Sequence, residues 1–340
     1  MAEPSAKDSV PVDNIGLGHM SDVPVAAFDP VFWLHHCNVD RLLAIWQKFN
    51  KDKWFDSPYE NDPTPKTELQ PFHYDTAGNI WFSEKCRNVE DLNYQYDDLV
   101  AGPDMIDPST GKVDEQKYLD ALREHIYELY PSTSKSIRNQ PRYRGEAGFN
   151  DYIINVVYDR YALGGRAYSI DFFIGSPPER HSGRRQHENF VGTVYTFSSP
   201  IETAAGGVAC NNCKTQQEEG ILSKAQVSLT VPLLVKAQRH AQAEFSAANL
   251  GYGLDLEGDG VEGYLEGHLR WEFVELGGRL RDASEFPKTK VAVYKGVGAH
   301  PSGTMKLPSF RNYKLLTRAT RGKRWGVDAG DPMIVEDGGE

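Results

Sequence analysis

The fold is decided by Phe28-Asp-Pro-Val-Phe-Trp-Leu-His-His-Cys-Asn-Val-Asp-Arg41, which continues as Leu42-Leu-Ala-Ile-Trp46. Asp29 can cap the N-terminus of a helix, and Pro30 suits the first helical turn. Further residues recur at steps of three and four, so they share one helical face. They are Phe32, His36, Val39, Leu43 and Trp46, with a second apolar row beside them. The stretch therefore predicts a largely buried helix with His36 facing the interior.

Two adjacent histidines on this helix are candidates for metal binding. His35 lies about 100° from His36 around the helix axis. Asp40 follows His36 by one turn, where a carboxylate can orient an imidazole. A lone buried histidine is more often a core residue satisfied by hydrogen bonds. A His-His pair with an aspartate four residues later, in an aromatic frame, favours a metal ligand instead.

The sequence F-W-L-H-H-C-N-V-D-R resembles the F-x-x-H-H-x-x-x-D signature of type-3 dicopper proteins, which are tyrosinases, catechol oxidases and molluscan haemocyanins. In that signature the second histidine binds the second copper. The resemblance therefore implies His36 as a copper ligand, and it places Phe32, His35 and Asp40 around that ligand.

Two further segments extend the resemblance to fungal tyrosinases. Gly16-Leu-Gly-His-Met-Ser21 resembles the loop before this helix in fungal members. Asn93-Tyr-Gln-Tyr-Asp97 resembles the Y-x-Y element that closes their catalytic domain. From about residue 14 to about residue 297, the chain resembles the C-terminal half of a fungal tyrosinase.

The histidine count limits what the chain can do by itself. The family's site takes six histidines, three for each copper, and some come from an H-x-x-x-H helix. The chain has ten histidines, and no two are four residues apart. By resemblance one ligand of six is present, so the chain looks truncated. Because one imidazole is not a copper site, we expect it to be inactive alone.

Length and composition set the class of protein. With 340 residues, 39% hydrophobic and 25% charged, the chain can form two soluble domains. A net charge of −11 argues against nucleic acid or an anionic membrane as a partner. No apolar run approaches the roughly 18 residues of a spanning helix, and residues 1–12 lack the apolar core of a signal peptide. We expect an intracellular (cytoplasmic) protein.

The predicted fold class is α+β, a remnant of a helical dicopper bundle followed by an antiparallel β-sandwich. Residues 1–101 are expected to form the partial copper-binding domain. Residues 102–150 are expected to form a linker with one helix at about Glu115–Tyr130, where apolar residues follow a period of 3.6. Residues 298–340, rich in Gly, Pro, Arg and Lys, predict a mobile tail.

Residues 151–297 carry the pattern of the β-sandwich. Alternation with a period of two and Gly/Pro turns are typical of antiparallel strands. One helical interlude is expected at about Leu234–Leu250. In fungal pro-tyrosinases a β-rich C-terminal domain covers the active-site mouth, so the resemblance implies the same role here. The expected strands are 152–159, 167–174, 190–197, 226–234, 264–274 and 290–294.

The pair Cys210-Asn-Asn-Cys213 is the second candidate site. Two thiols at this spacing can chelate a soft ion or form a disulfide. A structural zinc site is not expected, because there is no second C-x-x-C. Some fungal pro-tyrosinases carry a C-x-x-C in the covering domain, which implies a role in delivering Cu(I). We expect an exposed turn; two unrelated thiols are the alternative.

A third feature also comes from the resemblance. In latent family members one apolar side chain of the covering domain enters the dicopper pocket like a substrate ring. Phe197 is the aromatic candidate for this plug, and Ile201 is the aliphatic one. Phe197 as a core residue at a strand end is the alternative.

The sequence is compatible with three functions. The complete protein can be a copper-dependent oxidase that converts phenolic small molecules to o-quinones for melanin. The chain can instead be a shielding and copper-handling module that acts on a partner, such as the missing N-terminal half or a copper chaperone. An oxygen carrier of haemocyanin type is the third reading.

Overall fold

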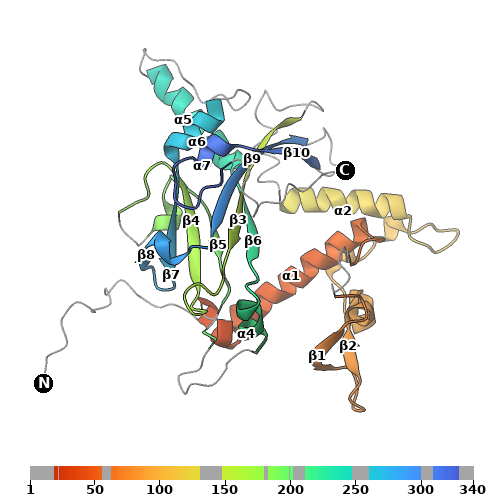
Figure 1. The fold of residues 1–340 in the computed structure, drawn as a ribbon. Coiled ribbons are helices and arrows are strands. Elements are labelled where there is room, and N and C mark those ends of the chain that lie inside the picture. The colour runs from red at the N-terminus through yellow and green to blue at the C-terminus, as the bar shows by residue number, and fades with distance from the viewer. Residues whose placement is uncertain are drawn as a thin grey trace, which may run out of the picture. The chain divides into compact units, whose positions relative to one another are not determined.

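The computed structural model describes residues 19–21, 23–55, 63–130, 148–179, 183–198, 200–201, 211–246, 260–299 and 309–328. The chain divides into two compact units (Figure 1). The helical unit comprises Pro30–Pro131 and Gly303–Met305. The sandwich unit comprises Met1–Asp29, Ser132–Ser302 and Lys306–Glu340. The domain boundaries inferred from the sequence stay predictions.

The helical unit is built on two α-helices. Helix α1 spans Pro30–Phe49 and begins at the proline that the sequence favoured for the first turn. Helix α2 spans Glu115–Leu129, as predicted, and Asp114 caps it by accepting a hydrogen bond from the Lys117 N–H at 3.1 Å. Between them lie a β-hairpin and short 3₁₀ turns: β1 Glu68–His73, β2 Ile80–Phe82, η3 Ser83–Cys86, η4 Val89–Leu92, η5 Asp97–Leu99 and η6 Pro103–Met105.

Helix α1 is mostly exposed, so the prediction of a largely buried helix is wrong. Its buried residues are Ala44 and Ile45. Periodicity shows which face of a helix is apolar, but burial requires an element that packs on that face. The short hairpin and turns described in this unit do not cover a helix of 20 residues. Its exposed large apolar side chains are Val31, Trp33, Leu34, Val39, Leu42, Leu43 and Trp46.

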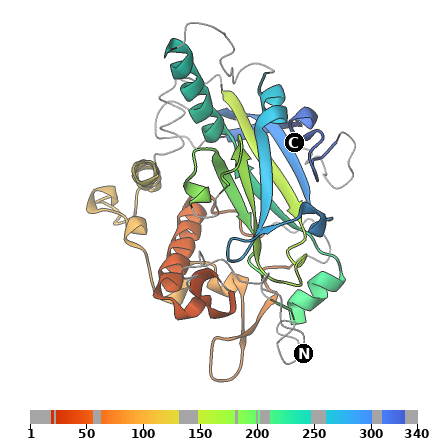
Figure 2. The same ribbon diagram turned by 90° about the vertical axis from the view of Figure 1, so that its left-hand side faces the viewer.

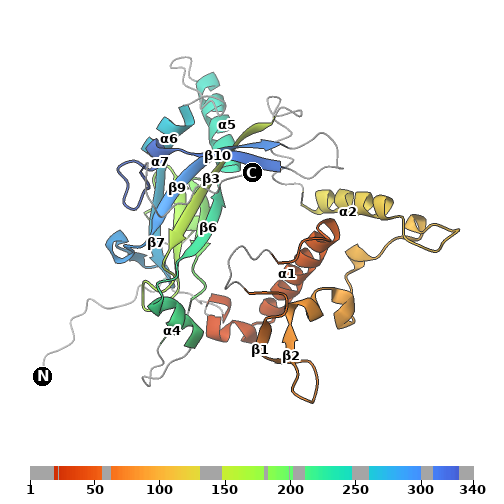
Figure 3. The same cartoon turned by 45° about the vertical axis from the view of Figure 1, so that its right-hand side comes forward.

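The sandwich unit contains two four-stranded antiparallel sheets, of order β10-β9-β3-β6 and β5-β4-β7-β8 (Figures 2 and 3). The predicted α+β class with an antiparallel β-sandwich is confirmed. The strands are β3 Phe149–Tyr158, β4 Tyr168–Ile174, β5 Phe190–Tyr195, β6 Ser223–Ser228, β7 Leu269–Glu275, β8 Leu280–Arg281, β9 Lys290–Ala299 and β10 Ser309–Leu315.

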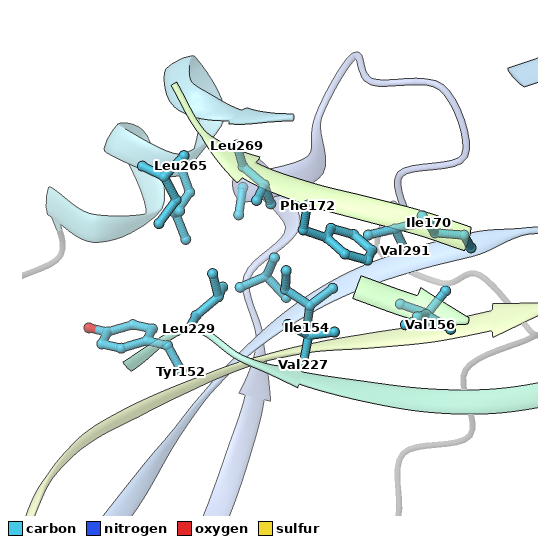
Figure 4. Close-up of a cluster of buried hydrophobic side chains, with 14 of the residues drawn as sticks. Tyr152, Ile154, Val156, Ile170, Phe172, Val227, Leu229, Leu265, Leu269 and Val291 are labelled. Atoms are coloured by element: carbon cyan, nitrogen blue, oxygen red, sulfur yellow. The ribbon is translucent and has the colours of Figure 1, made fainter. Parts of the chain in front are cut away.

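One hydrophobic core joins the two sheets (Figure 4). Alternate residues of each central strand point into it, as the period of two requires. From β3 come Ile154 and Val156, and from β4 come Ile170 and Phe172, all 1% exposed or less. The cluster also takes residues from β7 and β9, so the sandwich is held by contacts between sheets as well as by strand pairing.

Helices replace two of the expected strand segments. Residues 230–234 begin helix α5 (Thr230–Ser246), and residues 264–268 end helix α6 (Gly260–His268). The buried pairs Leu229/Leu233 and Val261/Leu265 are each spaced by four, which is the helical period. The helical interlude therefore begins earlier than predicted. The other helical elements among the described residues are α4 Asn211–Glu218, α7 Thr317–Thr320, η1 His19–Ser21, η2 Val23–Phe28, η8 Arg184–Gln186 and η9 Ala283–Glu285.

Residues 309–328 belong to the sandwich, so the prediction of a mobile tail is wrong for them. Strand β10 pairs with β9, and the backbone of Val291 exchanges hydrogen bonds with Trp325 and Val327 at 2.8 and 3.0 Å. Asp151 secures the segment further, because it accepts from the Tyr313 hydroxyl at 2.6 Å and from the Thr230 hydroxyl at 2.5 Å. The overall composition of the tail does not indicate these few anchoring residues.

No helix among the described residues is both long enough and apolar enough to cross a lipid bilayer.

Candidate functional site

His36 lies on the exposed surface of α1, contrary to the prediction that it is buried. His35 is exposed as well. The Phe32 ring packs on the His36 ring with centroids 4.1 Å apart. The two imidazoles lie edge to face at 5.6 Å. The helix therefore presents a pair of histidines supported by one aromatic ring.

Asp40 does not orient His36. Its Oδ2 accepts hydrogen bonds from the hydroxyls of Tyr94 and Tyr96, both at 2.6 Å. Among the described residues, no hydrogen bond joins Asp40 to the imidazole of His36. Two phenols from the Y-x-Y element occupy the carboxylate instead, so the predicted role of Asp40 beside the ligand is wrong. Its observed role is to attach the Y-x-Y element to α1.

The two tyrosines are strongly affected by this environment. Burial, followed by the hydrogen bond to Asp40, raises the pKa of Tyr96 to about 12 and the pKa of Tyr94 further still. The Tyr96 hydroxyl also lies 3.1 Å from the carbonyl oxygen of Cys37. Both phenols therefore stay protonated and act as donors at neutral pH.

Asp98 is a second tie between α1 and the following chain. Arg41 holds it with two nitrogens, Nε to Oδ2 and Nη2 to Oδ1, the latter at 2.8 Å. The His125 Nε2 lies 2.9 Å from Oδ1, and the Tyr130 hydroxyl accepts from Arg41 Nη1 at 3.0 Å. The bonds from Arg41 hold the pKa of Asp98 far below its usual range.

These ties form one structure, which we call the anchor cluster: Asp40, Arg41, Tyr94, Tyr96 and Asp98. The sequence motifs named Asp40 and the two tyrosines separately, but their pairing was missed. Arg41 and Asp98 were missed altogether, although Arg41 completes the quoted motif and Asp98 follows the Y-x-Y element directly. Through the contact of Asp98 with His125, the cluster ties the helix that carries the two histidines to α2.

The described residues do not make a copper site by themselves. None of their His, Cys, Asp and Glu side chains form a group of three or more that could hold a metal ion. His36 can offer one imidazole, which alone does not bind copper as a type-3 centre. The copper expected from the resemblance needs ligands beyond those described.

Cys213 lies in helix α4, so the expectation of a surface turn is wrong for this residue. It is partly buried and disulfide-bonded, whereas Cys37 and Cys86 are free. Cys210 lies outside the described residues. The Tyr161 hydroxyl donates to Gln216 Oε1 at 2.8 Å and ties α4 to the turn after β3. A disulfide-bonded Cys213 must be reduced before it can bind Cu(I).

The two plug candidates differ sharply in exposure. Phe197 follows β5, and its side chain is 64% exposed, so it is not a core residue. Ile201 is 6% exposed. Phe197 also has a positive φ of 44°, which is uncommon for a bulky residue.

Comparison with known proteins agrees with both units. The family model described as tyrosinase C-terminal domain matches residues 151–293, and the common central domain of tyrosinase matches residues 10–49. A tyrosinase of Aspergillus fumigatus is 34% identical over 89% of this chain and 44% of its own length. Polyphenol oxidase 3 of Agaricus bisporus is 28% identical over 70% of the chain and 42% of its own length.

Solved structures extend the similarity to the fold. The apo-protyrosinase of Aspergillus oryzae aligns with a TM-score of 0.54 and 27% identity, over 88% of this chain and 41% of that one. The chain thus spans about two fifths of the length of the relatives it matches. On these matches the chain belongs to the tyrosinase family, as a counterpart of the C-terminal half of its fungal members.

Proposed function

We propose that the complete protein is a copper-dependent polyphenol oxidase that converts monophenols and o-diphenols to o-quinones. One observation carries the proposal: α1 presents the family's histidine motif, with Phe32 packed on His36, in a chain whose sandwich matches the tyrosinase C-terminal domain. His36 would then supply one imidazole to copper. The other ligands come from outside the described residues.

We further infer that the sandwich unit covers the phenol-binding site in a latent form. Phe197 is the better of the two plug candidates. Phe197 is 64% exposed and can enter a pocket, whereas Ile201 is 6% exposed and offers little surface to one. The anchor cluster would hold α1, which carries His36, within the helical unit.

Loaded with copper, the 340-residue chain alone is expected not to oxidise 4-methylcatechol, because it provides a single imidazole of the family's ligand set. An oxygen electrode measures this directly. A longer chain that joins this sequence to the N-terminal part of a fungal tyrosinase is expected to be active once the covering domain is displaced. In that longer chain, His36→Ala should abolish oxidation.

His73→Ala is the matched control, because His73 is an exposed histidine on β1 that the ligand assignment does not use. Catechol oxidation by the chain alone would contradict the proposed ligand set. Full activity of the His36→Ala form of the longer chain would contradict the assignment of His36.

We also propose that Cys210 and Cys213 handle Cu(I) when they are reduced, because thiolates suit this soft ion. The reduced chain is expected to take up one Cu(I) in competition with a chromogenic chelator. The double variant Cys210→Ser/Cys213→Ser should lose this uptake, and the oxidised chain should not show it. Cys86→Ser is the control; equal Cu(I) uptake by the double variant would leave the pair with a structural role only.

A further inference from the structure

Phe197 combines two features that do not favour stability. Its φ of 44° lies in the left-handed region, which an aromatic residue enters only when its surroundings impose it. The residue is 64% exposed, although burying an aromatic side chain is one of the larger gains available to a folding chain. A glycine or asparagine would fit this backbone with less strain. The position therefore invites a functional explanation.

The residues on either side of Phe197 are turned inward and fixed. Thr196 is 1% exposed and Ser198 is 4% exposed, with their hydroxyls 3.0 Å apart. Thr196 is tied twice to Tyr168 of β4: its N–H donates to the Tyr168 carbonyl at 3.0 Å, and its hydroxyl accepts from the Tyr168 N–H at 3.1 Å. Thr196 thus fixes the turn to β4 just before the exposed residue, and Ser198 is buried just after it.

Arg160 completes this arrangement from the turn after β3. Its Nη2 donates to the carbonyl oxygens of Thr196 at 3.2 Å and of Phe197 at 2.5 Å. Its Nε is buried and finds no hydrogen-bond partner among the described residues. A buried N–H without a partner costs free energy. The guanidinium therefore bonds the two carbonyl oxygens through Nη2 at the cost of leaving Nε without a partner among the described residues.

The neighbouring ring limits where Phe197 can go. Tyr195 meets it edge to face, with centroids 5.0 Å apart and ring planes at 86°. The Phe197 ring is therefore supported at its base while most of its surface stays open. A side chain that is fixed before binding loses little conformational entropy when it enters a pocket.

We propose that Arg160 is the positioning residue that holds Phe197 in this strained, outward conformation, so that the sandwich carries a preformed aromatic knob for a site that binds a phenol ring. The partner's identity rests on the covering function proposed above. The effect of Arg160 on Phe197 is a property of this chain alone, so it can be measured in the absence of any partner.

The first experiment measures the ring itself. 4-Fluorophenylalanine is placed at position 197 of the full chain, and its ¹⁹F resonance is recorded. One narrow line is expected in the otherwise unchanged chain. Arg160→Ala should shift and broaden it, and Arg160→Lys, which keeps a cationic donor, should recover part of the original signal. An unchanged line in Arg160→Ala would overturn the positioning role.

The second experiment tests the knob. The chain is added to a fungal tyrosinase catalytic domain that lacks its own C-terminal domain, and inhibition of catechol oxidation is titrated. Phe197→Ala should weaken inhibition roughly 10- to 100-fold, as expected for losing one buried aromatic ring. Phe197→Tyr should retain it. Arg160→Ala should weaken it comparably at equal folded protein, with Arg160→Lys in between.

Arg166→Ala is the matched control, because Arg166 lies in the same turn region but pairs with Glu275 at 2.9 Å instead. Inhibition that is insensitive to Phe197→Ala would overturn the knob. Loss of inhibition in Phe197→Ala but not in Arg160→Ala would overturn Arg160 alone. A chain that never inhibits would contradict the covering function, while the ¹⁹F result would still decide the role of Arg160.

Discussion

Phe172→Ala is expected to lower the free energy of unfolding of the sandwich unit by about 3–5 kcal/mol. Phe172 lies on the central strand β4, is fully buried, and points into the core shared by both sheets. Truncation removes the transfer free energy of the ring and leaves a cavity between two sheets that strand pairing prevents from closing freely. Thermal unfolding followed by near-ultraviolet circular dichroism measures the effect.

The matched control is Phe310→Ala, which removes the same ring from the edge strand β10, where it is 49% exposed. We expect a loss of roughly 1 kcal/mol or less there, because most of that ring is in water in the folded chain. Equal losses at the two positions would show that the inter-sheet core does not dominate the stability of this unit.

The β-sandwich could be predicted because alternation is a local signal. β3, β4 and β9 each have one face in the common core, so their core residues recur at every second position. The segments at 230–234 and 264–268 were assigned to strands because short apolar runs fit both periods. A spacing of four, as between Leu229 and Leu233, distinguishes a helix from a strand only when the elements that pack on these residues are known.

The site could be predicted in part. The motif correctly placed Pro30 in the first turn of α1, because this depends only on neighbouring residues. The burial of α1 could not be predicted, because it depends on elements that pack from elsewhere. The attachment of Asp40 to Tyr94 and Tyr96 joins residues more than 50 positions apart, and no local pattern encodes such a contact.

The same limit explains the C-terminal segment. Its composition is that of a loop, and its anchors are single residues: Tyr313 on Asp151, and Val327 beside Val291. The matched family domain ends at residue 293, whereas the sandwich described here continues to residue 328. Strand β10 shows that a segment can complete a sheet without an apolar alternation of its own, since all but one of its residues are exposed.

Asp98→Asn is expected to destabilise the helical unit by about 2–3 kcal/mol, which is less than the roughly 3–5 kcal/mol for breaking a fully buried ion pair, because the partners here are partly exposed. The change leaves Arg41 without its carboxylate and weakens the contact to His125 on α2. Hydrogen exchange read by mass spectrometry should show faster exchange in α1 and α2, with the sandwich peptides unchanged.

Asp104→Asn is the matched control, because Asp104 pairs with Lys117 in an exposed position and such pairs contribute little. Exchange in α1 and α2 should stay as in the unchanged chain. Equal acceleration by the two substitutions would contradict a special role of Asp98.

The loss of stability caused by Asp98→Asn is also expected to depend on pH. The bonds from Arg41 lower the pKa of Asp98 in the folded chain, so the folded carboxylate binds its proton less readily than the unfolded one. Its stabilisation is therefore complete above the unfolded pKa of about 3.9, and is lost as the pH falls through that value toward the folded pKa. Asp98→Asn should remove this acid-dependent part, so the difference in stability between the two chains should shrink below about pH 4. A difference that stays constant from pH 7 to pH 3 would show that the charge of Asp98 does not hold α1 to α2.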